Sequence, residues 1–101
     1  MPRNKRCRRI GMLPGVTLYK PAGKPLREMN VIELGFDEFE AIRLADKEGL
    51  YHEDAAERMN ISRQTFGRVV QSARRKIASA IVEGKGIRFE NRENTITVNK
   101  Q

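Results

Sequence analysis

The strongest pattern in the chain is a helical repeat of apolar positions in its C-terminal half. Apolar side chains recur there every three or four residues, at Phe66, Val69, Val70, Ala73, Ile77, Ala80 and Ile81. This spacing predicts one long helix over residues 63–83, with these side chains on one side. At about 1.5 Å per residue the helix would be roughly 30 Å long. Part of it must therefore pack against the rest of the domain or against another subunit.

Two shorter helices are expected before the long one. Asp37 and Glu40 have the spacing of a capping box, and Gly49 is a residue that commonly ends a helix. The first helix is therefore expected over residues 37–48, with Phe39, Ile42 and Ala45 at helical spacing. The second is expected over residues 53–59.

Alternating patterns predict a minor sheet. Residues 31–36 alternate as a short, half-buried strand would. Ile87 and Phe89 alternate with polar residues, as do Ile96 and Val98, and the polar run at 91–94 suits a turn. Residues 86–101 are thus expected to form a β-hairpin, docked beside the first strand because an isolated hairpin is marginal in water. Such a hairpin also resembles the wing of winged-helix proteins, which would place Arg92 near a DNA backbone.

Residues 1–30 are expected to form an extended basic arm. All four prolines and several glycines lie in this stretch, and it has no helical or strand periodicity. Its apolar residues suggest that part of the arm packs on the body of the domain; they are Ile10, Met12, Leu13, Val16, Leu18 and Tyr19.

Residues 52–71 have the pattern of a DNA-binding helix-turn-helix. Ala56 falls where two helices touch closely, Asn60 suits a left-handed turn, and Ser62 can cap a new helix. The inward apolar contacts would come from Ala55, Met59, Ile61, Phe66 and Val69. The predicted fold is therefore mainly α: a three-helix helix-turn-helix domain over residues 31–85, with the arm, one short strand and the hairpin.

Charge changes this picture by indicating a polyanionic partner. The 101 residues fit one domain, with a net charge of +7 and a pI of about 10.1. Residues 1–27 hold eight bases and no acid, residues 28–57 hold ten acids and two bases, and residues 58–88 hold eight bases and one acid. The basic ends suit phosphates, and the acidic middle suits water or a protein. The lone cysteine, Cys7, favours the reducing cytoplasm, and no stretch is long enough to span a membrane.

Four polar side chains near the start of the long helix are candidates for base reading in a major groove. Arginine can bond guanine and glutamine can bond adenine through two hydrogen bonds each; the candidates are Arg63, Gln64, Arg68 and Gln71. Candidate phosphate contacts are Ser62, Thr65, Arg58, Arg74 and Arg75. In the arm they are Arg3, Lys5, Arg6, Arg8 and Arg9. The alternative for each group is an ordinary solvated surface. Cys7 is either a plain thiol or a redox or metal sensor.

Catalysis is not expected. His52 and Glu53 begin a zinc-protease motif, but Ala56 stands where its second histidine is needed. The chain shows no nucleophile with a base, no phosphate loop and no cofactor fingerprint. We therefore expect no catalytic residues, no metal and no cofactor.

Several strings resemble a known prokaryotic family. They are PRNKRCRR at residues 2–9, KPAGKPL at 20–26, DEFEAIRLADKEGL at 37–50 and AAERMNISRQTFGRVVQSARRKIASAIVEGK at 55–85. The chain is similar to uncharacterised protein family 0251, also called domain of unknown function 134, over roughly residues 2–88. The resemblance implies DNA binding through a helix-turn-helix like that of sigma-factor region 4. By that likeness Ser62, Arg63, Gln64 and Arg68 would face DNA.

These observations together predict a sequence-specific double-stranded DNA-binding protein, a transcriptional regulator acting as a homodimer. Ile77, Ile81 and exposed strand edges are candidate dimer contacts. One alternative is a sigma-like adaptor that contacts RNA polymerase or another protein through the acidic helices at 37–59. Another is an RNA-binding or ribosome-associated protein, for which the basic arm would suffice.

Overall fold

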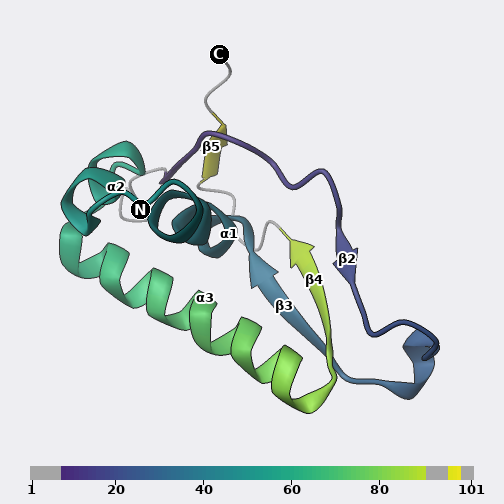
Figure 1. The fold of residues 1–101 in the computed structure, drawn as a ribbon. Helices are drawn as coiled ribbons and strands as arrows, with labels where there is room; N and C mark the ends of the chain where they lie inside the picture. Colours follow the sequence, from purple (N-terminus) through teal and green to yellow (C-terminus); the bar gives the residue numbers. More distant parts are fainter. Residues whose placement is uncertain (1–7, 91–95, 99–101) are drawn as a thin grey trace, which may run out of the picture.

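The computed structural model describes residues 8–90 and the strand 96–98. This part of the chain is a small domain of three α-helices, two short helical segments and five strands (Figure 1). In chain order they are β1 (Arg8–Ile10), β2 (Leu18–Tyr19), η1 (Leu26–Glu28), β3 (Val31–Gly35), α1 (Phe36–Ile42), η2 (Arg43–Lys47), α2 (His52–Arg58), α3 (Arg63–Glu83), β4 (Gly86–Glu90) and β5 (Ile96–Val98).

The helices lie where the sequence predicts them, with a correction at the start of the first. Gly35, not Asp37, is the N-cap of α1, and its N–H donates to the Glu38 carboxylate at 2.7 Å. Asp37 is already in the first turn. After Ile42 the helix widens into the π-helical segment η2, and Gly49, at a φ of 77°, ends it as expected.

The predicted C-terminal hairpin is wrong. β4 lies between β2 and β3, antiparallel to β2 and parallel to β3, so both of its edges are already paired. β5 instead pairs in parallel with β1, with Arg9 opposite Thr97. The strand expected over residues 31–36 and its place beside β4 are confirmed, except that it ends at Gly35 and Phe36 is the first residue of α1. There is no two-stranded wing formed by β4 and β5, and Arg92 lies outside the described residues.

One apolar core joins the three helices. α3 packs against α1, α2, β3 and β4. Phe66 and Met59 are fully buried in the core, and Ala56 is nearly so, as its small size predicts. The other members of this cluster are Ala41, Leu44, Ala55 and Val70. The fully buried apolar positions here are Ala41 of α1 and Leu44 of η2, while Ile42 of α1 and Ala45 of η2 pack at the edge of the cluster.

The arm expected over residues 1–30 is partly structured. It contains β1, β2 and η1, and Ile10 is 0% exposed. The expectation that part of the arm packs on the body is confirmed: Ile10 is fully buried, and the Tyr19 ring packs edge-on against Phe89 at a centroid distance of 5.8 Å. The apolar side chains that stay about half exposed are Met12, Leu13 and Val16. Local sequence could not separate the two groups because burial here depends on distant partners in α1 and α2.

Candidate nucleic-acid interface

A tight turn joins α2 to α3. Asn60 has a φ of 59°, the left-handed conformation predicted for it. Ser62 caps α3: its Oγ accepts the Thr65 N–H at 3.0 Å and donates to the Thr65 hydroxyl at 2.9 Å. Phe66 then enters the core one turn into the helix. The cap and the buried ring together fix where α3 begins and which side of it faces outward.

The outward side of α3 carries a polar stripe of four residues. A straight helix turns about 100° per residue, so positions spaced by four, three and four residues share one side. Gln64, Arg68, Gln71 and Arg75 have this spacing, and all four are exposed. None makes an ion pair or a side-chain hydrogen bond to another described residue. The opposite side of the helix holds the buried residues Phe66, Val70 and Ala73.

Arg63 lies at one border of this stripe, next to α2. It is exposed and lines a shallow hollow with Tyr51, His52 and Glu53. The Tyr51 side chain is 81% exposed, the largest exposed aromatic surface among the described residues. Sequence reasoning missed Tyr51. The sequence signal that could have indicated Tyr51 is its position directly before the second helix.

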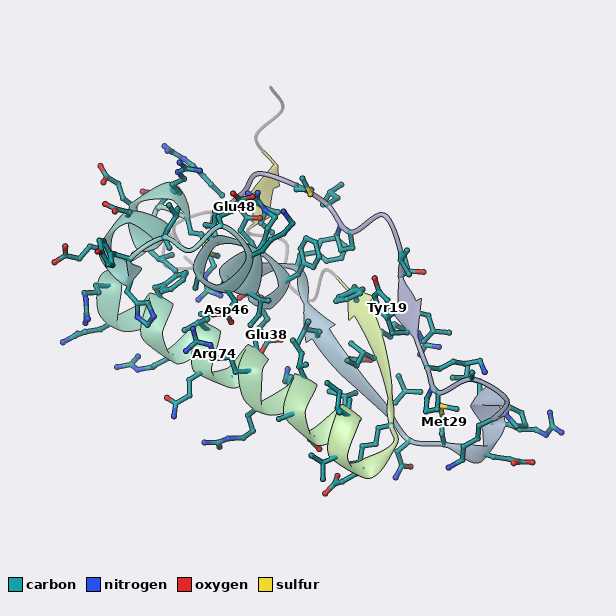
Figure 2. All side chains as sticks on the ribbon, in the orientation of Figure 1. Tyr19, Met29, Glu38, Asp46, Glu48 and Arg74 are labelled. Carbon is teal, nitrogen blue, oxygen red and sulfur yellow. The ribbon has the colours of Figure 1, made fainter. Side chains whose placement is uncertain are left out.

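Arg74 differs from Arg58 and Arg75, the other arginines proposed for phosphate contact on α2 and α3, because it forms an ion pair with an acid. Its guanidinium bonds Asp46 in a bidentate manner, with contacts of 3.0 and 2.7 Å, and the two side chains face each other in Figure 2. The Arg74 contact lowers the pKa of Asp46. Arg75 and Arg58 are exposed, with no ion pair among the described residues. The sequence did not indicate the Asp46 contact, because 28 residues separate the partners.

A buried carboxylate sets the angle between α1 and α3. Glu38 is 8% exposed and accepts hydrogen bonds from Ser72 at 2.6 Å and from Lys76 at 2.9 Å, besides the Gly35 N–H. Burial raises the pKa of Glu38, but these three donors outweigh it and lower the pKa below its usual value. Lys76 also donates to the Glu33 carbonyl oxygen. Lys76 is thus a structural link and not a free surface charge.

The end of the basic arm is fastened beside the turn between α2 and α3. Arg8 pairs with Asp37, the Arg9 N–H donates to the Met59 carbonyl at 3.1 Å, and the Gly11 N–H donates to Glu40 at 3.0 Å. Arg9 is exposed, whereas Arg8 is partly buried by its partner. The remaining candidates for phosphate contact in the arm are Arg3, Lys5 and Arg6. They lie outside the described residues, and so does Cys7.

Within the described residues, no group of three or more histidine, cysteine or acidic side chains could hold a metal ion. No helix in this part of the chain is long and apolar enough to cross a membrane.

Comparison with known proteins identifies the family. Residues 1–97 match the family model described as "Protein of unknown function DUF134". The chain belongs to this family. A curated UPF0251 protein of Moorella thermoacetica is 58% identical over 90 residues, which cover 89% of this chain and 60% of the relative. A UPF0251 protein of Chlorobaculum tepidum is 54% identical over 84 residues, covering 83% of this chain and 55% of the relative.

A third relative, a UPF0251 protein of Thermoanaerobacter pseudethanolicus, is 49% identical over 90 residues, which cover 89% of this chain and 76% of the relative. The chain spans less than two thirds of the length of the Moorella and Chlorobaculum proteins. No solved structure matches the chain. The family assignment that the sequence motifs predicted is thereby confirmed.

Proposed function

We propose that this DUF134-family protein binds double-stranded DNA and reads base pairs in the major groove with α3. In this proposal α2, the turn at Asn60 and α3 act as a helix-turn-helix. The observation that carries it is the exposed stripe of Gln64, Arg68, Gln71 and Arg75 opposite the buried side of α3. These side chains have donors and acceptors that no described residue uses.

The residue types in the stripe suit base edges. Arginine offers two parallel donors that match guanine O6 and N7, and glutamine offers the donor and acceptor that match adenine. Arg63 and Gln64 come first on the helix, so they would reach deepest if α3 enters the groove by its N-terminal end. Arg75 lies about two turns past Arg68 and would meet the phosphate rim.

The acids of α2 set the side from which DNA can approach. Glu53, Asp54 and Glu57 are exposed and make no ion pair with another described residue. Phosphates would be repelled if the duplex lay along these carboxylates. The duplex should therefore lie on the Gln64 and Arg68 side of α3, with Arg63 between the two surfaces.

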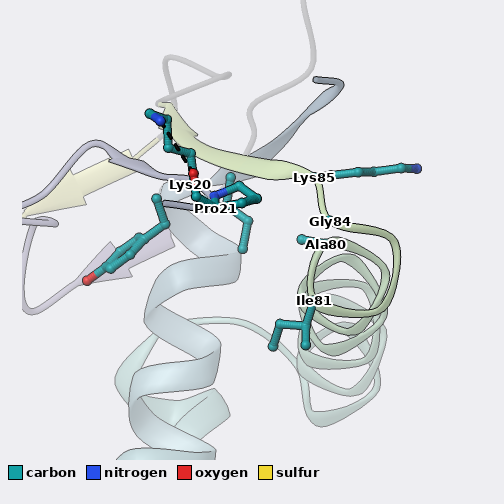
Figure 3. A pocket seen from close by; sticks show the side chains of 8 residues that line it. Lys20, Pro21, Ala80, Ile81, Gly84 and Lys85 are labelled. Carbon is teal, nitrogen blue, oxygen red and sulfur yellow. Dashed lines mark hydrogen bonds between the residues drawn. The ribbon is translucent and has the colours of Figure 1, made fainter. Parts of the chain in front are cut away.

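We propose that a second copy of the chain binds in an apolar groove at the C-terminal end of α3. The groove, of about 330 Å³, is lined by Tyr19, Ile81 and Ile87, and Figure 3 shows Ile81 on α3 at its edge. Ile81 is 75% exposed, and the charged residues that line the groove are Lys20 and Lys85.

The chain itself offers a complement to this groove, an exposed apolar residue followed by an acid. Val82 is exposed and Glu83 follows it, and Glu83 already bonds Lys85 at 2.8 Å within one copy. Around a two-fold axis, Glu83 of each copy would face the lysines of the other. Such a homodimer leaves the Gln64–Arg68 end of α3 free, and it would read two half-sites about 34 Å apart or a multiple of that.

The proposed role is regulation of transcription in the cytoplasm by binding, without catalysis. A second candidate role is that of an adaptor that contacts RNA polymerase or another protein. The observation that favours it is the exposed Tyr51 next to the free acids Glu53, Asp54 and Glu57. Aromatic side chains are enriched in protein interfaces, and the rim of such an interface is polar.

Selection of bound duplexes from a random pool tests the proposal. We expect an enriched palindrome. At the selected site, Arg68→Ala and Gln64→Ala should each weaken binding by about 1–3 kcal/mol and relax sequence preference. Arg27→Ala is the matched control, because Arg27 is exposed on η1 and also lacks an ion pair among the described residues. Failure to enrich any duplex, or preference for structured RNA at equal salt, would contradict the proposal. Loss of function on Glu53→Lys but not on Arg68→Ala would favour the adaptor.

A further inference from the structure

Gly67 occupies a position in α3 where neither the backbone angles nor any contact with the described residues requires a glycine. It lies in the second turn of the helix, and its φ is not positive, unlike that of Gly23, Gly49 and Gly84. A Cβ added at Gly67 would meet no atom within 4 Å. By contrast, a Cβ on Gly86 would lie 3.3 Å from the Tyr19 carbonyl oxygen, so close packing explains that glycine.

A glycine inside a helix is costly. It loses more backbone freedom on folding than any other residue, and only proline is a poorer helix former. Alanine would fit at position 67 without a contact and would stabilise the helix. Packing in the described part of the chain therefore does not account for Gly67, and we look for its role in contact with a partner.

The surroundings of Gly67 indicate what that reason is. Residues three and four positions away are its neighbours on the helix surface. Arg63 and Gln64 precede it by four and three residues, Arg68 follows it directly, and Gln71 lies four residues on. Gly67 is thus a patch of bare backbone at the centre of the four side chains assigned to base reading.

We propose that Gly67 is the point of closest approach between α3 and the base-pair edges, where the missing side chain lets the helix sit deep in the groove. This inference rests on the proposed DNA binding and assigns Gly67 a role in specificity. The four polar side chains are long, whereas position 67 between them has no side chain. Bare backbone between them lets all four reach base edges without a side chain holding the helix off the groove floor.

Substitution of Gly67 should change stability and binding in opposite directions. We expect Gly67→Ala to raise Tm by about 4 °C. It should weaken binding to the selected duplex roughly tenfold, comparable to the cost of one mismatched base pair. Gly67→Leu should weaken binding further without unfolding the domain, because the added side chain points into open space. Thermal melting and fluorescence anisotropy at fixed salt measure the two effects.

Ala78→Gly is the matched control. Ala78 is exposed and lies eleven residues further along, three turns on and on nearly the same side of α3. We expect Ala78→Gly to lower Tm by a similar amount and to leave DNA affinity unchanged. This result would show that backbone flexibility in α3 does not by itself set the affinity.

Three results would overturn the inference. Gly67→Ala could bind the duplex as tightly as the parent, or it could lower Tm, which would mean that the fold itself requires the glycine. If Arg68→Ala weakens binding and Gly67→Ala does not, DNA binding stands and only the role of Gly67 falls. If the unchanged protein binds no duplex, both the function and this inference are refuted.

Discussion

Replacing Glu38 by glutamine tests the link that orients α3. The change keeps the size of the side chain and removes its charge. The carboxylate accepts three hydrogen bonds, from the Gly35 N–H at 2.7 Å, Ser72 Oγ at 2.6 Å and Lys76 Nζ at 2.9 Å. A glutamine has one acceptor oxygen where glutamate has two. Its NH2 group would face one of the three donors and could not accept a hydrogen bond from it. Lys76 would also lose its counter-ion.

The expected loss of stability follows from these contacts. A hydrogen bond to a charged group contributes about 1.5–3 kcal/mol and a neutral one about 0.5–1.5 kcal/mol, a difference of roughly 1 kcal/mol for each bond. Three bonds set an upper value of about 3 kcal/mol. The Lys76 side chain is 27% exposed and can be partly hydrated in the variant. We therefore expect Glu38→Gln to cost about 2 kcal/mol, or about 8 °C in Tm.

The pH dependence gives this prediction a second readout. The pKa of Glu38 is lowered on folding from 4.5, so its stabilising contribution is fully present above 4.5 and is lost as pH falls through the lower folded value. The difference in stability between the parent and Glu38→Gln should be largest near neutral pH. It should narrow as the solution is acidified below pH 4.5.

Urea unfolding of both proteins from neutral pH down to acid pH measures this difference. Glu57→Gln is the control, because Glu57 is exposed on α2 and lacks an ion pair among the described residues. We expect it to change stability by less than about 0.5 kcal/mol. Equal stability of Glu38→Gln and the parent at neutral pH, or a difference that does not depend on pH, would refute the role given to Glu38.

Three further predictions concern other parts of the domain. Asp46→Asn should free Arg74 to bind phosphate, raising affinity for random duplex DNA and steepening the salt dependence by about one unit; unchanged affinity would mean that Arg74 does not reach DNA. Ser62→Ala removes the cap that Thr65 donates to and should cost about 1 kcal/mol in urea unfolding, and a neutral result would show that the cap does not stabilise α3. Ile10→Ala should cost about 2–4 kcal/mol, because Ile10 is fully buried; a loss below 1 kcal/mol would mean that the end of the arm is not part of the core.

The sequence predicted what neighbouring residues decide. The bounds of α3, the left-handed Asn60 and the Ser62 cap all depend on residues within one or two turns of each other. The exposed side of α3 follows from the same local repeat. The sequence therefore predicted that Gln64 and Arg68 are exposed. Its contact with DNA stays a prediction.

Sequence reasoning gave the wrong strand pairing because the partners of β4 come from distant segments of the chain. The alternation at 87–89 and 96–98 correctly indicated strands, but β4 pairs with β2 and β3, which come from residues 18–19 and 31–35. Nothing local shows that both edges of β4 are already used. The N-cap of α1 was misplaced by two residues, because Glu38 reaches back to Gly35 while Asp37 pairs with Arg8 from the arm.

The acidic middle of the chain has a more specific structural role than its charge suggests. Five of its acids pair with cations: Asp37, Glu38, Glu40, Asp46 and Glu48. Their partners come from the arm, from η2 and from α3. Glu53, Asp54 and Glu57 remain exposed on α2 without such a pair. The paired acids therefore hold the arm and α3 in place, and Glu53, Asp54 and Glu57 form a group of acids on α2 that are unpaired among the described residues.

Chemical-shift mapping of the protein with a selected duplex tests the central claim most directly. The account predicts that the largest amide and side-chain shifts fall on residues 62–71, including the Gln64 and Gln71 side-chain amides and the Arg68 guanidinium. The groove at Tyr19 and Ile81 should show no change beyond that caused by dimer formation. Shifts that fall on the exposed acidic side of α2, or on the sheet, with none on α3 would contradict the claim that this helix reads DNA.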